Sequence, residues 1–191
     1  MHVHRLSTSD LPEYSGVGIS FQVASVLDVY PDATGDFELT ERGVASPYIK
    51  DYDSVPESRP TSWPPRFDLA GWGLFGVRSS GVLVGGAAVA PPSEAVSSVL
   101  EPGNAVLFDL RVAPQARRHG VGKALFASSA AWAREHGARH LITETQNTNV
   151  PACRFYQGLG CVLLSANSSA YPDLPDETEL VWSYHLGETA A

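Results

Sequence analysis

The sequence predicts an α/β or α+β fold with a central sheet. From Gly71 onward, segments with a strand pattern alternate with segments with a helical pattern, and glycine or proline marks most of their ends. The chain has 191 residues, which is enough for one domain with a substantial core, and it contains no internal repeat. We therefore expect a single domain over residues 1–191.

The first part of the chain predicts strands followed by an irregular loop. The stretches ISFQVASVLDVY and DFELTE, both before Tyr52, alternate apolar and polar residues as half-buried strands do. Five prolines lie between residues 47 and 65. We therefore interpret residues 53–68 as a loop insertion within the domain.

The rest of the chain, residues 71–186, predicts regular elements in sequence. WGLFGVRSSGVLVGGAAVAPP predicts two strands around a Ser-Ser-Gly turn, and NAVLFDLRVAP predicts a strand that ends at Pro114. A helix is expected from Gly120 to His136, with its apolar residues on one face and Gly137 as its stop. RHLITETQ predicts the next strand, a second helix begins near Asn149, and CVLLSA and TELVWSYHL predict two closing strands.

Composition excludes several classes of function. The net charge of -8 argues against non-specific binding to nucleic acid or anionic membranes. The two cysteines, Cys153 and Cys161, lack the spacing of metal ligands, so we expect free thiols and no metal. No apolar run approaches the length of a membrane span, and the N-terminus lacks a signal-peptide core. A cytoplasmic location is the resulting expectation.

The stretch VAPQARRHGVGKALF, residues 112–126, predicts an anion-binding turn. A strand leads into a glycine-containing turn that opens a helix, whose first amides are unpaired and whose dipole favours negative charge. A Walker loop would need glycine at Arg117 and Ser or Thr at Ala124, and a dinucleotide fingerprint would need glycine near Leu125. Three basic side chains and His119 within seven residues favour phosphate; the alternative is a helix start with solvated basic residues.

This stretch resembles the acyl-coenzyme A signature of the GNAT acetyltransferases, Arg-x-x-Gly-x-Gly/Ala, through Arg117, Gly120 and Gly122. The second signature of the family is similar to NTNVPACRFYQGLGC, which contains Asn149, Phe155, Tyr156 and Gly160. Residues 141–184 are also similar to streptothricin acetyltransferases. Cys161 departs from the family, which usually has phenylalanine there, and we expect this to affect packing only.

The resemblance implies a mixed, mostly antiparallel sheet that splays in a V and is flanked by helices. It also implies acetyl-coenzyme A as co-substrate, without a metal. The pantetheine arm would lie like an extra strand, and an amide near Leu110 would polarise the thioester carbonyl. The cofactor-binding residues implied in this way are Leu110, Val112, Arg117, Arg118, His119, Gly120, Val121, Gly122, Lys123, Ala124 and Asn149.

Acetyl transfer to an amine requires that the amine lose a proton and that the leaving thiolate gain one. The resemblance makes Tyr156 the acid; the alternative is a packed ring beside Phe155. Glu144 is the first candidate for the base and Asp109 the second. Both carboxylates can instead bind the ammonium group of the substrate while a water chain carries the proton.

The acceptor is predicted to be a small cationic amine. Between Asp28 and Glu57 there are eight acidic residues and only two basic ones, and a second acidic cluster follows Tyr171. We expect Tyr171 to contact the acceptor. In the family such segments border the acceptor cleft, which favours a polyamine, an aminoglycoside-like compound or a β-lysyl antibiotic such as streptothricin. A generic solubilising surface is the alternative. Two rival functions stay open: protein or peptide N-acetylation, and a non-catalytic acyl-coenzyme A sensor. The formation of a homodimer also stays open.

Overall fold

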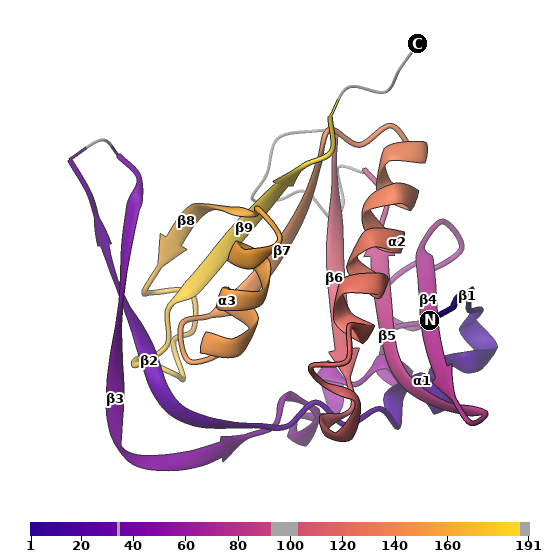
Figure 1. Ribbon diagram of the computed structural model, residues 1–191, viewed down its shortest axis with the longest axis horizontal. Helices are drawn as coiled ribbons and strands as arrows, with labels where there is room; N and C mark the ends of the chain where they lie inside the picture. Colours follow the sequence, from indigo (N-terminus) through magenta and orange to yellow (C-terminus); the bar gives the residue numbers. More distant parts are fainter. Residues whose placement is uncertain (34, 93–102, 188–191) are drawn as a thin grey trace. The chain divides into compact units, whose positions relative to one another are not determined.

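The computed structural model describes residues 1–33, 35–92 and 103–187 (Figure 1). The chain divides into two compact units. The first unit comprises Met1–Phe21, Asp51–Leu141 and the C-terminal segment from Leu186, and the second comprises Gln22–Lys50 and Ile142–His185. No helix among the described residues is long and apolar enough to cross a lipid bilayer.

The first unit contains four neighbouring strands in the order β1 (Val3–Arg5), β4 (Gly73–Ser79), β5 (Val82–Ala90) and β6 (Asn104–Val112). Each neighbouring pair is antiparallel, and Phe75, Ala87 and Leu110 lie opposite one another across three of the strands. The predicted hairpin around the Ser-Ser-Gly turn and the predicted strand before Pro114 are therefore confirmed.

Helices cover both faces of these strands. The helices are α1 (Leu11–Ser15) and α2 (Val121–Glu135), with short 3-10 turns η1 (Thr8–Asp10) and η5 (Pro114–Ala116). A Cβ on Gly85 would come within 2.6 Å of Val121 in α2, and one on Gly86 within 2.2 Å of the Tyr14 ring in α1. Because successive strand residues point to opposite faces, these two glycines allow each helix to approach β5 closely from its own side.

The proline-rich segment is irregular, as predicted, and it packs firmly within the first unit. It forms three 3-10 turns, η2 (Tyr52–Ser54), η3 (Pro56–Ser58) and η4 (Pro60–Ser62). Trp63 is buried, and its ring meets the ring of Phe108 edge-on at 5.3 Å. Phe108 lies at a bulge in β6, between Leu107 and Asp109, which pair with consecutive residues of β5. The insertion therefore stabilises β6 beside Asp109.

The second unit contains strands in the order β7 (His140–Gln146), β9 (Glu179–His185) and β8 (Val162–Asn167), with helix α3 (Val150–Gly158). It also contains a two-stranded ribbon, β2 (Phe21–Pro31) and β3 (Phe37–Lys50). Thr145 of β7 faces α3, because its hydroxyl lies 3.4 Å from Cys153 Sγ and accepts a hydrogen bond from Trp182 Nε1 at 2.8 Å.

Buried Asn147 joins three parts of the second unit. Its side chain donates to the carbonyl of Leu27 in β2 at 3.1 Å and accepts from the amide of Thr178, just before β9, at 2.9 Å. Its backbone amide and carbonyl pair with the same two residues. The end of β7 is thereby fixed to the ribbon and to the start of β9.

Sequence reasoning found the strands and helices from β2 onward but missed β1 and α1. It also ended the second ribbon strand too early, since β3 continues to Lys50 through Pro47. Pro47 is tolerated because β3 has a hydrogen-bonded neighbour only in β2 among the described residues, and an edge strand can leave an amide unpaired.

Candidate active site

The predicted anion-binding turn lies in the first unit, at the start of α2. Gly120 caps the helix with φ +83° and Arg118 has φ +64°, both in the left-handed region. A Cβ on Gly120 would meet nothing within 4 Å, so backbone conformation rather than space favours glycine there. The first hydrogen bond along the helix runs from the Ala124 amide to the Gly120 carbonyl at 3.0 Å. The amides of residues 121–123 come before it and therefore have no partner along the helix. This end of α2 therefore offers donors and a positive dipole to an anion.

Some residues predicted to bind the cofactor have other partners at this turn. Arg117 donates from Nε to the Val112 carbonyl at 3.0 Å and from Nη2 to the Ser20 carbonyl at 2.9 Å. Burial lowers the pKa of Arg117. Its observed role is to hold the turn against the end of β6, and the Ala124 amide is used within the helix. Arg118, His119 and Lys123 remain exposed beside the free amides.

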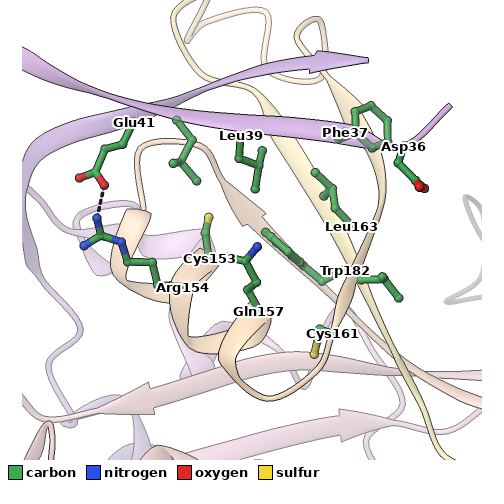
Figure 2. A pocket seen from close by; sticks show the side chains of 12 residues that line it. Asp36, Phe37, Leu39, Glu41, Cys153, Arg154, Gln157, Cys161, Leu163 and Trp182 are labelled. Carbon is green, nitrogen blue, oxygen red and sulfur yellow. Dashed lines mark hydrogen bonds and ion pairs between the residues drawn. The ribbon is translucent and has the colours of Figure 1, made fainter. Parts of the chain in front are cut away.

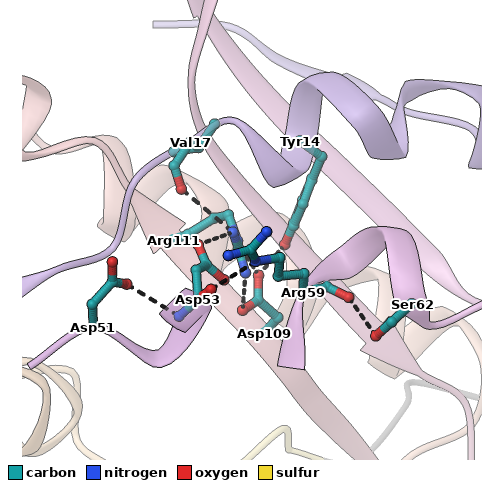
Figure 3. Close-up of polar contacts among 8 residues, drawn as sticks. All are labelled: Tyr14, Val17, Asp51, Asp53, Arg59, Ser62, Asp109 and Arg111. Carbon is teal, nitrogen blue, oxygen red and sulfur yellow. Dashed lines mark hydrogen bonds and ion pairs between the residues drawn. The ribbon is translucent and has the colours of Figure 1, made fainter. Parts of the chain in front are cut away.

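A buried ion-pair cluster lies under β6 in the first unit (Figure 3). Arg111, only 1% exposed, binds both oxygens of Asp109 at 2.8 and 3.1 Å and one oxygen of Asp53 at 3.2 Å. The hydroxyl of Tyr14 donates to Asp109, and the Arg111 guanidinium lies 5.1 Å from the centre of the Tyr14 ring. Burial opposes the charge on Arg111, but Asp109 and the other neighbours raise its pKa overall.

This cluster decides against Asp109 as a free base, because both of its oxygens have buried partners. Burial raises the pKa of Asp53, against the lowering effect of Arg111, and Asp53 Oδ1 is buried without a hydrogen-bond partner. Sequence reasoning missed the whole cluster. Its one local signal was the pair Asp109 and Arg111, which lie two residues apart on the same face of a strand.

Leu110 and Val112, predicted to offer amides to the cofactor, lie in β6 opposite Ala87 and Gly85 of β5. Both side chains are half-buried. Their predicted contact with the pantetheine arm stays a prediction.

Helix α3 of the second unit carries Asn149 and Tyr156. Asn149 caps the helix, as predicted, because its side chain accepts from the Ala152 amide at 3.3 Å. Tyr156, two turns further on, is 6% exposed, and its ring meets that of Phe155 edge-on at 5.2 Å. Packing thus accounts for the position of the ring, and the role of the hydroxyl stays a prediction.

Glu144 and Tyr171 lie together in the second unit. Glu144 is exposed on β7, and the hydroxyl of Tyr171, from the β8–β9 connection, donates to its Oε1. The side-chain amide of Gln146, two residues further along β7, donates to the Tyr171 oxygen at 2.8 Å. Sequence reasoning named the first two residues but missed Gln146, although its i+2 spacing from Glu144 places both on one strand face.

The two faces of β7 carry different groups. Thr145 points to α3, so Glu144 and Gln146 point to the opposite face. Tyr156, in α3, therefore does not lie on the Glu144 face. A cavity of about 400 Å³ lies on the α3 side, beneath the β2–β3 ribbon, and an ion pair between Glu41 and Arg154 lies at its wall (Figure 2). Because Cys153 and Trp182 line it, this cavity is separate from the Glu144 side chain.

Ion pairs reduce the negative charge of the first predicted acidic segment. Asp28 pairs with Arg42 at 2.9 Å, Glu41 pairs with Arg154, and Lys50 pairs with Glu177 of the second cluster. Asp173 and Asp176 are exposed. Burial and, to a smaller extent, the charge of Glu144 raise the pKa of Glu179. Acidic side chains also lie on β7 and β9, at Glu144 and Glu179, and in the β8–β9 connection.

The two cysteine thiols are poor nucleophiles, and the described residues form no metal site. Burial raises the pKa of Cys153 and of Cys161 to about 11. His2, His4 and His185 are exposed. The described residues contain no group of three His, Cys, Asp or Glu side chains able to hold a metal ion.

Comparisons with known proteins show where the chain belongs. Residues 43–161 match the Acetyltransferase (GNAT) family, a span that includes both the α2 turn and α3. The streptothricin acetyltransferase of Streptomyces lavendulae is 30% identical over 171 residues, which cover 89% of this chain and 86% of that protein. The streptothricin acetyltransferase of Escherichia coli is 30% identical over 170 residues, covering 87% and 86%.

Solved structures share the fold. A nourseothricin acetyltransferase superposes with a TM-score of 0.76 at 26% identity, covering 97% of this chain and 98% of that one. A Bacillus anthracis protein solved with acetyl coenzyme A gives a TM-score of 0.79 at 24% identity, covering 96% and 98%. These likenesses confirm the predicted α+β fold class. The family match and the two streptothricin acetyltransferases confirm the predicted enzyme class, an acetyl-coenzyme A-dependent acetyltransferase. The chain belongs to the GNAT family of acetyltransferases.

Proposed function

We propose that the protein transfers the acetyl group of acetyl-coenzyme A to a primary amine of a small cationic acceptor, of the streptothricin kind, by direct attack. The observation that carries the acceptor class is the exposed Glu144 carboxylate, held by Tyr171 on a face that also bears Glu179. A carboxylate at that position attracts an ammonium group and disfavours an anionic one. The similarity to streptothricin acetyltransferases over most of the chain supports the same class.

The start of α2 supplies most of the proposed cofactor site. The open left-handed conformation at Gly120 and the free amides of residues 121–123 suit the pyrophosphate, with Arg118, His119 and Lys123 beside it. Leu110, Val112 and Asn149 complete the proposed set. When bound, acetyl-coenzyme A supplies the activated thioester. Arg117 acts by holding the turn in place.

Three residues perform the chemistry in this proposal. Glu144 binds the ammonium group of the acceptor and accepts its proton, directly or through a water. An amide near Leu110 donates to the carbonyl oxygen as charge develops there. The Tyr156 hydroxyl gives its proton to the departing thiolate.

A thiol-release assay with acetyl-coenzyme A tests the proposal. Streptothricin, spermidine, a neutral primary amine and a peptide with a free N-terminus serve as acceptors. We expect turnover with a cationic small acceptor and a loss of about 100-fold or more in Glu144→Gln, as for a general base. Glu135→Gln, exposed at the end of α2, is the matched control and keeps full activity. Preference for the peptide would contradict the acceptor class, and binding of acetyl-coenzyme A without turnover would indicate a sensor.

A further inference from the structure

The side chains of Tyr171, Gln146 and Glu144 form a hydrogen-bonded chain with a defined direction. The Gln146 nitrogen carries only donors, so the phenol oxygen of Tyr171 accepts that bond at 2.8 Å. The single proton of the phenol is then directed at Glu144 Oε1. A donor that reaches a carboxylate in this way favours one orientation of the carboxylate.

The phenol is suited to donate its proton to Glu144. Burial and the hydrogen bond to Glu144 raise the pKa of Tyr171 well above its ordinary value, so it stays protonated across the working range of pH. Its donated bond also offsets the like charges of Glu144 and Glu179, which face the same side of neighbouring strands.

The position of Tyr171 is fixed by several contacts. Its carbonyl accepts from the Leu174 amide at 2.9 Å, within the β8–β9 connection. Glu177, near the end of that connection, pairs with Lys50, and Thr178 bonds to Asn147. Residues of β3 and β7 therefore hold the β8–β9 connection that carries Tyr171, all within the second unit.

We infer that Tyr171 and Gln146 are positioning residues for acetyl transfer, which orient Glu144 Oε1 and leave Oε2 for the ammonium group of the acceptor. This inference rests on the proposed function. Glu144 Oε2 has no hydrogen-bond partner among the described residues. The effect of both residues reaches the acceptor only through Glu144, so the binding of acetyl-coenzyme A does not depend on them.

Kinetics of Tyr171→Phe, Gln146→Leu and the double variant test the functional part. With streptothricin as acceptor, Tyr171→Phe is expected to lower kcat/KM about 10-fold or more, as the loss of a charge-assisted hydrogen bond does. The KM for acetyl-coenzyme A should stay within about twofold. The double variant should lose no more than Tyr171→Phe does, because residues in one chain are not additive. Tyr30→Phe, whose side chain is 56% exposed, is the matched control.

A spectroscopic measurement tests the chain without any turnover. In ¹H–¹⁵N spectra, the side-chain amide signals of Gln146 should move in Tyr171→Phe and also in Glu144→Gln, but not in Tyr30→Phe. Unmoved Gln146 signals would overturn the inference. So would a Tyr171→Phe variant with unchanged acceptor kinetics, or one in which both substrates are affected equally. If the wild type acetylates no amine, the proposed function fails, and the Gln146 signals alone then decide whether the chain exists.

Discussion

Replacement of Arg111 by methionine tests the buried cluster that supports β6. Methionine keeps most of the apolar volume but removes the charge that Asp109 and Asp53 share. Removal of one partner from a buried ion pair costs about 3–5 kcal/mol, because the remaining charge is left uncompensated. Two carboxylates lose their cation here, so we expect a loss of at least about 3 kcal/mol in the free energy of unfolding. Urea titration followed by tryptophan fluorescence measures it.

The loss in the free energy of unfolding should also increase as the pH rises. Burial raises the pKa of Asp53 and Arg111 lowers it, so Arg111→Met raises this pKa further. A carboxyl whose pKa is higher in the folded state contributes stability at low pH that is lost as pH rises through the folded value. The deficit of the variant should therefore be larger near about pH 8 than near about pH 5.

A surface arginine provides the control for this prediction. Arg78 pairs with Glu13 where both side chains are substantially exposed, at 31% and 42%. Solvent screens such pairs, so Arg78→Met should lose far less stability than Arg111→Met, at any pH. A deficit below about 1 kcal/mol in Arg111→Met, equal at both pH values, would refute the reasoning about the buried cluster.

Three further predictions concern the site. Gly122→Val should weaken acetyl-coenzyme A binding severely by calorimetry while circular dichroism shows an intact fold, because a side chain at the α2 start blocks the amides from phosphate; unchanged affinity in a folded variant would rule this assignment out. Tyr156→Phe should lower kcat about 100- to 10,000-fold with acetyl-coenzyme A affinity nearly unchanged, as the loss of a general acid does, and turnover within about threefold of the parent would mean that another group is the acid. Cys153 and Cys161 should react slowly with iodoacetamide in the folded protein near neutral pH, because burial raises both pKa values to about 11; rapid alkylation would contradict their burial.

Local patterns predicted most of the fold from the sequence. Alternation along β2, the turn between β4 and β5, and the glycine that precedes α2 each carry their information within about ten residues. The elements β1 and α1 were not predicted, because β1 has only three residues and α1 only five. Elements that short are defined by tertiary contacts such as the approach of Tyr14 to Gly86, which no local pattern encodes.

The site was predictable where a motif carried it and not where distant residues meet. The α2 turn and the cap at Asn149 follow from sequence motifs. In contrast, Arg111 meets Asp53 across 58 positions in the chain, and Gln146 meets Tyr171 across 25. Two predicted site residues also have partners that no motif indicated: Asp109 pairs with Arg111 and accepts from Tyr14, and Arg117 donates to the carbonyls of Val112 and Ser20. Side-chain partners of this kind depend on how the strands align, and local sequence patterns do not reveal that alignment.

The mass spectrum of a reaction mixture shows whether the protein transfers the acetyl group directly to an amine. The protein is incubated with acetyl-coenzyme A and streptothricin, and both the small molecules and the intact protein are weighed. We expect an acceptor that carries one added acetyl group on an amine, free coenzyme A in equal amount, and a protein of unchanged mass, as direct attack requires. An unmodified acceptor, or an acetyl group covalently attached to the protein in place of the acceptor, would contradict the account.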